Sequence, residues 1–168
     1  MKAPHFFINK PSEIKNPIVI NNFINRGEDR FWNTNYQGTL NTYQKKLKNL
    51  SQKILSFGGN QVVLPSIEED LEYIQMRGVF CIGEHSILKR GLPSQCHRNS
   101  CDLYMMEERE DFFIMTGYAL SKDGFWRQHS WCVDYKNEKI IETTEPRIAY
   151  FGFVMTHSEC DDFCFDNY

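Results

Sequence analysis

The chain has 168 residues, of which 41% are apolar and 24% charged, a composition typical of an ordinary globular domain. Its formal net charge is −3, so it lacks the excess of lysine and arginine that neutralises phosphates, which argues against DNA or RNA as the main partner. It has no run of about 18 apolar residues and no signal-peptide core, so we expect a cytoplasmic protein with no membrane partner.

Six cysteines are present, at positions 81, 96, 101, 132, 160 and 164. Thiols stay reduced in the cytoplasm, so we interpret these residues first as free thiols and only second as disulfide partners. A cysteine is usually a small buried hydrophobic residue, and we expect Cys81, Cys101 and Cys132 to be core residues.

We expect residues 1–168 to form a single domain. It begins with an irregular, packed arm over residues 1–37. The arm is rich in Asn and Pro, and its apolar segments, 6–8 and 17–20, allow at most one strand. A helical part over 38–107 follows. Its first helix has apolar residues at every third or fourth position: Leu40, Tyr43, Leu47, Leu50, Ile54 and Phe57. Gly58 and Gly59 are expected to end this helix, and its lysines form a solvated face.

A second, shorter helix is predicted by the capping-box pattern of Ser66 and Glu69, with Gly78 as its stop signal. Residues 79–82 form a plausible strand. A turn at 91–93 precedes Ser94, which we expect to cap a third helix that runs through Cys96 to about Glu107.

The pattern then changes to period two, which predicts strands over 113–120, 125–135, 139–143 and 149–156. Short hairpin-type turns separate the first three of them, so residues 112–156 read as an antiparallel meander. Helices followed by a meander predict an α+β fold, with helices packed on a small antiparallel sheet. The last eleven residues predict one helical turn or a loose tail.

Cys96 is the candidate nucleophile. A thiol reacts as its thiolate, and the first turn of a helix favours an anion because its N–H groups and peptide dipoles point at it. The N–H of Cys96 itself is not used by the helix and is available to a developing oxyanion.

His129 and Glu142 complete the predicted catalytic group. His129 shares one face of its strand with Trp131 and Val133. Paired positions across a two- or four-residue hairpin turn have numbers that sum to an odd value, as 129 and 142 do. Glu142 is therefore expected on the face of His129, one or two steps along the diagonal, within reach of a long side chain. By the same parity Glu145 faces the other way.

A cysteine at a helix start, a histidine in His-x-Trp and an acid before Thr on the next strand resemble the transglutaminase-like branch of the papain-like cysteine enzymes. The arylamine N-acetyltransferases have the same order. The resemblance spans 91–144 and implies a papain-like core, with Cys96 as nucleophile, His129 as base and Glu142 as the acid that orients it. It also implies a hydrolase or acyl-transferase that acts on a peptide, protein or small amide substrate, without a cofactor.

Five further residues are candidates for binding the oxyanion or the substrate: Gln95, His97, Asn99, Gln128 and Trp131. His97 follows Cys96 but points about 100° away from it on a helix, so we do not expect it to be the base.

Two other interpretations stay open. His157, Cys160 and Cys164, or Cys96, His97 and Cys101, offer zinc ligands, although structural zinc sites prefer two closely spaced cysteine pairs and we predict no metal. A non-catalytic binding protein on a papain-like scaffold is the second. The oligomeric state is open.

Overall fold

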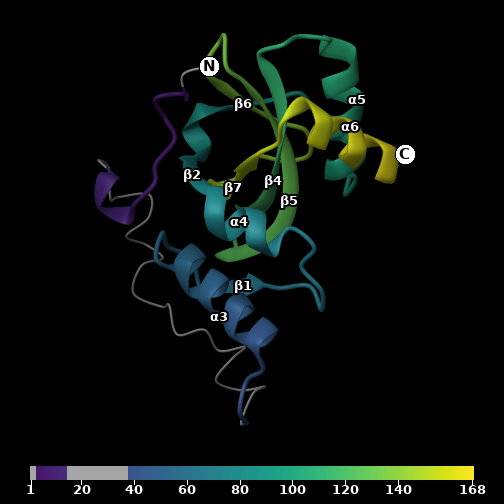
Figure 1. The fold of residues 1–168 in the computed structure, drawn as a ribbon. Coiled ribbons are helices and arrows are strands. Elements are labelled where there is room, and N and C mark those ends of the chain that lie inside the picture. The colour runs from purple at the N-terminus through teal and green to yellow at the C-terminus, as the bar shows by residue number, and fades with distance from the viewer. Residues whose placement is uncertain (1–2, 15–37) are drawn as a thin grey trace.

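The computed structural model describes residues 3–14 and 38–168. A seven-stranded sheet with the order β2-β7-β4-β5-β6-β3, in which β1 also pairs with β5, forms its centre (Figure 1). The strands are β1 (Gln61–Val63), β2 (Val79–Ile82), β3 (Ser86–Leu88), β4 (Phe112–Leu120), β5 (Phe125–Asp134), β6 (Lys139–Glu142) and β7 (Ala149–Val154). The helices of the described residues are α3 (Thr42–Leu55), α4 (Leu71–Arg77), α5 (Cys96–Glu107) and α6 (His157–Asp166), with short 3-10 helices at Pro11–Glu13 and Gly83–His85.

The α+β class is as predicted, but the sheet is mixed and the expectation of a purely antiparallel sheet is wrong. β1 runs parallel to β5, and β3 runs parallel to β6. The predicted meander holds from β4 through β6, whereas β7 returns to pair with β4. β1 and β3 have three residues each, which is too short for an alternating pattern to be recognised in the sequence.

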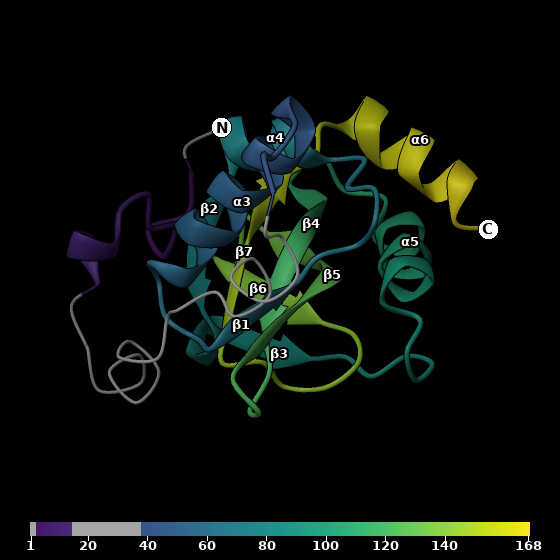
Figure 2. The ribbon, with the colours of Figure 1, turned by 90° about the horizontal axis from the view of Figure 1, so that it is seen from below.

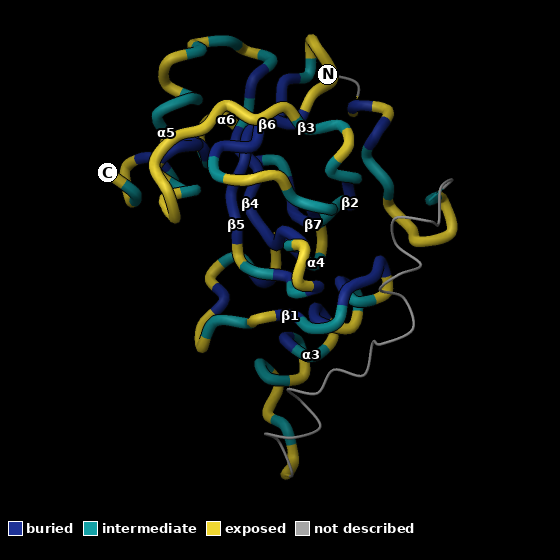
Figure 3. Tube along the Cα trace, turned by 180° about the vertical axis from the view of Figure 1, so that it is seen from behind, coloured by how far each residue is buried: buried dark blue, intermediate teal, exposed yellow. Residues whose placement is uncertain are grey.

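The main core lies between the helices and one face of the sheet. All four helices contribute to it, for example through Leu50 of α3, Ile74 of α4, Cys101 of α5 and Cys160 of α6. Figure 2 shows α3, α4 and α6 on the same side of the sheet, with α5 beside β5. The buried residues concentrate in the central strands (Figure 3).

The opposite face of the sheet carries a smaller cluster that includes Met115, Trp131 and Tyr150, and Phe6 of the N-terminal arm covers it. Ile8 of the arm forms a bridge with Phe80. The packed arm expected over 1–37 is therefore present in residues 3–14. Its second apolar segment, 17–20, lies outside the described residues.

The helix boundaries follow local signals in one case and tertiary contacts in another. Asn41 caps α3 in a capping box with Gln44, and Gly58 follows the helix with φ 118°. The capping box predicted for Ser66 is not formed, because α4 begins later, with Asp70 at its N-cap. The segment between is held instead by Glu68, whose buried carboxylate accepts a hydrogen bond from Tyr118.

The C-terminal segment is a ten-residue helix, so the expectation of a single turn or a loose tail is wrong. Thr156 and Glu159 form a capping box at its start, and Cys160 and Cys164 are buried on its inner side. Among the described residues, no helix combines the length and the hydrophobicity that crossing a membrane requires.

Strand β5 is paired along one edge with β4 through residues 126–134. Its other edge pairs with β1 through residues 125–127 and with β6 through residues 132–134. Residues 128–131 are therefore left without a strand on that side. Helix α5 packs against β5, and its first residue reaches this gap.

Candidate active site

Cys96 is the first residue of α5, and Gln95 is the N-cap, without a side-chain cap hydrogen bond. The expectation that Ser94 caps this helix is wrong. Ser94 has φ 59°, a left-handed conformation that turns the chain before the helix begins. Cys96 nevertheless occupies the first turn, where the N–H groups are not used by the helix and the peptide dipoles favour an anion.

The sulfur of Cys96 is half-buried and lies against His129 and the free edge of β5. Burial by itself raises the pKa of the thiol, but the hydrogen bond to His129 and the charge of His129 lower it. The backbone N–H groups of Ser130 and His97 also donate to the sulfur and lower the pKa further. The balance is a pKa below the usual value of a cysteine, which favours the thiolate.

His129 of β5 and Glu142 of β6 form a buried pair on adjacent strands. Nε2 of His129 lies 3.1 Å from Oε1 and 3.0 Å from Oε2 of Glu142, and both residues are at most 3% exposed. Because Nε2 faces the carboxylate, Nδ1 is the ring nitrogen left for the sulfur of Cys96. Burial alone would lower the pKa of His129, but its contacts with Cys96 and Glu142 raise it to about 9.

The carboxylate of Glu142 is held by four donors besides the imidazole. Oε1 accepts hydrogen bonds from the N–H of Thr143 at 2.9 Å and from the N–H and hydroxyl of Thr144, both at 2.8 Å. Oε2 accepts a hydrogen bond from the hydroxyl of Tyr150 at 2.9 Å. A carboxylate fixed on both oxygens can hold a histidine ring in one orientation and one tautomer.

The pairing of β5 with β6 shows why the odd-sum rule for paired residues puts Glu142 on the face of His129. Val133 pairs with Ile140 and Cys132 with Ile141, so Glu142 follows on the same face as His129. Trp131 stacks on His129 with an interplanar angle of 19°. Tyr150 was not found from the sequence, because it comes from β7 and no local pattern places that strand near β6.

The other predicted residues take different roles. Gln95 and Gln128 are exposed, and Gln128 contacts Glu68 at 3.4 Å. Trp131 is fully buried, so it packs behind His129 and offers no accessible surface to a substrate. His97 turns away from Cys96, as predicted, and its Nδ1 lies 2.7 Å from Oγ of Ser130.

Asn99 holds the loop that leads into α5. Its side chain accepts from the N–H of Leu92 at 2.9 Å and donates to the carbonyl of Leu92 at 2.8 Å. A Cβ on Gly91 would lie 2.5 Å from the Asn99 amide, so the glycine allows this close approach. Asn99 is 5% exposed and is a structural residue of the site.

Replacement of Asn99 by leucine is expected to lower the free energy of unfolding by about 1 to 2 kcal/mol, because the N–H and the carbonyl of Leu92 lose their hydrogen bonds to the Asn99 side chain. Gln95→Leu is the control, since this exposed side chain caps nothing and its replacement should change stability by less than about 0.5 kcal/mol. Urea denaturation measures both. Equal effects of the two substitutions would contradict the structural role of Asn99.

The proposed zinc ligands are not gathered into a site. Nδ1 of His157 lies 2.8 Å from the hydroxyl of Tyr104, and Nε2 lies 3.1 Å from the carbonyl of Glu110. Cys101 and Cys164 are buried in the main core. Residues 3–14 and 38–168 contain no group of three or more His, Cys, Asp or Glu side chains arranged to hold a metal ion.

No protein-family model matches the chain, and no curated protein or solved structure matches it.

Proposed function

We propose that this protein is a thiol-dependent hydrolase or acyl-transferase that acts on an amide-like bond through Cys96, His129 and Glu142. The observation that carries the proposal is the buried contact between His129 and Glu142, with Cys96 as the second hydrogen-bond partner of the imidazole. A nucleophile, a base and a group that orients the base are the parts that covalent catalysis by a thiol requires.

The reaction begins when the Cys96 thiol gives its proton to Nδ1 of His129 and the thiolate attacks the carbonyl carbon of the substrate. The carbonyl oxygen becomes an oxyanion, and the N–H of Cys96 donates a hydrogen bond to it in this proposal. The intermediate collapses to a thioester as Nδ1–H protonates the leaving amine. Water or a second amine then attacks the thioester, the acyl group leaves Cys96, and the thiol is restored.

The proposal includes the papain-like core expected from the order of the three residues. It is supported by a nucleophile at a helix start beside the free edge of a strand, with the histidine on that strand and the acid at the end of the next. The substrate class that follows is a peptide, a protein or a small amide.

Alkylation with iodoacetamide tests the proposal. Cys96 should react with a pKa well below about 8.5, so that at pH 7 it reacts at least about tenfold faster than a model thiol. This shift should disappear in His129→Ala. The five other cysteines are buried, and peptide mapping separates their slower labelling from that of Cys96.

The acyl donor is then identified with a mixture of amide-directed activity probes. The probes that label the native chain but not Cys96→Ala indicate the acyl group that the site accepts. If the chain is a non-catalytic binding protein, Cys96 should be alkylated no faster than an ordinary thiol. If Cys96 reacts no faster than a model thiol at every pH, the catalytic proposal is wrong.

A further inference from the structure

A cavity of about 530 Å³ lies near the start of α5. His97, which follows Cys96, and Gln128, which precedes His129, both line it. His129 projects from the opposite face of β5, toward the cluster around Trp131. Cys96 at the free edge of β5 therefore lies between the imidazole on one side and this cavity on the other.

Carboxylates dominate the cavity wall. They come from the start of α4 and from α6: Glu69, Asp70, Glu159, Asp162 and Asp166. None of the described residues that line it is lysine or arginine. In the described part of the chain, only Glu159 of this set has a cationic partner, Arg77 at 2.6 Å. The remaining four acids leave the cavity with an uncompensated negative field, and a concave wall of one sign concentrates such a field.

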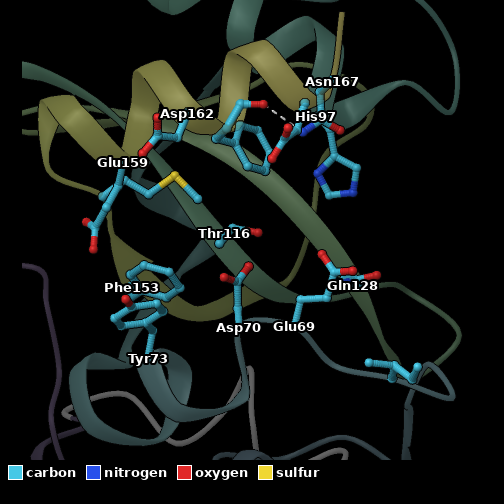
Figure 4. A pocket seen from close by; sticks show the side chains of 14 residues that line it. Glu69, Asp70, Tyr73, His97, Thr116, Gln128, Phe153, Glu159, Asp162 and Asn167 are labelled. Atoms are coloured by element: carbon cyan, nitrogen blue, oxygen red, sulfur yellow. Dashed lines mark hydrogen bonds between the residues drawn. The ribbon is translucent and has the colours of Figure 1, made fainter.

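Asp70 shows the effect of this field. Burial raises the pKa of its carboxyl group, and the charges of Glu69 and Glu159 raise it further. A cation placed in the cavity would relieve this repulsion. Figure 4 shows Asp70 beneath Thr116 on the sheet, with Asp162 on α6 above them and His97 and Gln128 to one side.

The chain already holds one cation at the border of the cavity. The guanidinium of Arg77 lies 5.4 Å from the ring centre of Tyr73 and 4.8 Å from that of Phe153, and it pairs with Glu159. All three of these partners also line the cavity. Aromatic rings combined with a carboxylate are a well-suited environment for an organic cation.

Two polar groups of the cavity wall have hydrogen-bonding capacity left for a ligand. Oγ of Ser130 lies 3.1 Å from Oγ1 of Thr116 and 2.7 Å from Nδ1 of His97. Nδ1 of His97 is therefore occupied, and Nε2 is the ring nitrogen left for a ligand. Burial and the charge of His129 both lower the pKa of His97, which keeps its ring neutral. Thr116 is 2% exposed, lines the cavity and retains its own O–H to donate.

We propose that this cavity binds a positively charged ammonium or guanidinium group of the substrate while the amide-like carbonyl lies at Cys96. This inference rests on the proposed function and adds a substrate class to it. Asp70 and Asp162 supply the charge, Nε2 of His97 accepts an N–H of the cation, and the aromatic side chains form the apolar part of the wall.

Charged thiol reagents of similar size test the proposal. The Cys96 thiolate attacks the sulfenyl sulfur of a methanethiosulfonate, forms a mixed disulfide and releases methanesulfinate. The probes are the aminoethyl reagent, with charge +1, and the sulfonatoethyl reagent, with charge −1. The measured quantity is the rate with the aminoethyl reagent divided by the rate with the sulfonatoethyl reagent. At low salt, this ratio should be higher for Cys96 than for a model thiol by about tenfold or more. The preference should fall as salt is added.

Asp70→Asn combined with Asp162→Asn should lower this ratio by about fivefold or more. The matched control is Glu72→Gln combined with Asp161→Asn, which makes the same charge change on the same two helices outside the cavity. The control should stay within about twofold of the native chain. A ratio equal to that of the model thiol, or an equal loss in both double variants, would overturn the cation site.

The two failures can be told apart. If Cys96 reacts rapidly with iodoacetamide but shows no charge preference, the cation site is wrong and the catalytic proposal stands. If Cys96 reacts slowly with all reagents, the catalytic proposal is wrong. Protection of Cys96 from iodoacetamide then identifies the source of the cation. Protection by N-acetyl-lysine amide or N-acetyl-arginine amide indicates a peptide side chain, and protection by putrescine indicates a free amine. No protection by either class would also overturn the cation site.

Discussion

Glu142→Gln is expected to reduce the reactivity of the site by roughly 10²- to 10⁴-fold, the range expected when the base of a catalytic triad takes the wrong tautomer. Oε1 of Glu142 faces three donors, from Thr143 and Thr144, so an amide must place its oxygen there. Its NH₂ group then faces Nε2 of His129 and the hydroxyl of Tyr150.

An NH₂ group at that position forces Nε2 of His129 to accept rather than to donate. The ring proton then lies on Nδ1, so the nitrogen that faces Cys96 can no longer take the thiol proton. The pKa of Cys96 should return toward the value of an ordinary thiol. The substitution should also lower the free energy of unfolding by about 2 kcal/mol, since a buried donor and acceptor become mismatched.

The measurement is the rate of turnover of the captured substrate, together with the rate of Cys96 alkylation at pH 7. Glu145→Gln is the matched control, because Glu145 is an exposed acid three residues further on that pairs with Arg147. We expect Glu145→Gln to keep the native rates of turnover and alkylation, and Glu142→Gln to lose most of both rates. Equal rates in the two variants would contradict the role of Glu142.

Acid is expected to remove stability that Glu142 supplies, beginning near pH 4.5. Burial alone would raise the pKa of Glu142, but the hydrogen bond and charge of His129 and the donors of Thr144 lower it from 4.5 to about 2. The unfolded chain therefore binds this proton first. The contribution is complete above about pH 4.5 and is lost as the pH falls through about 2, with a total of about 3 kcal/mol.

Cys96 and His129 should contribute opposite slopes across neutral pH. The raised pKa of His129, about 9, supplies stability that is present below about pH 6.5 and is lost as the pH rises through about 9. The lowered pKa of Cys96 supplies stability in the other direction, which is lost as the pH falls.

Urea denaturation between pH 7 and pH 3 measures the acid effect. The difference in unfolding free energy between the native chain and Glu142→Gln should shrink as the pH falls below about 4.5. Glu145→Gln should follow the native chain throughout. A difference that stays constant to pH 3 would show that Glu142 has an ordinary pKa in the folded state.

The elements that have a strong local period can be predicted from the residues alone. The apolar spacing of 40–57 predicts α3, and the alternation in 113–120 and 125–135 predicts β4 and β5. The position of Glu142 on the face of His129 also follows from the sequence, because pairing parity across a short hairpin depends only on residue numbers and turn length.

Capping signals were less informative, because a polar residue before an apolar run can be used in other ways. Ser94 adopts a left-handed conformation, and Gln95 takes the N-cap of α5. After Ser66, the chain is held by Glu68 in contact with Tyr118, and α4 begins only at Leu71. Contacts with distant residues set these backbone angles, and a four-residue pattern does not contain them.

The surroundings of the candidate nucleophile, by contrast, depend on how the whole chain packs. Tyr150 reaches Glu142 from β7, the three-residue strands β1 and β3 pair with distant partners, and the acids of α4 and α6 meet in one cavity. The strand pairings and the cavity join segments that are far apart along the chain, and Tyr150 reaches Glu142 from a strand that is not a neighbour of β6 in the sheet. Periodicity and turn length act over a few neighbouring residues, so they determine the elements, whereas packing of the whole chain determines which side chains share a site.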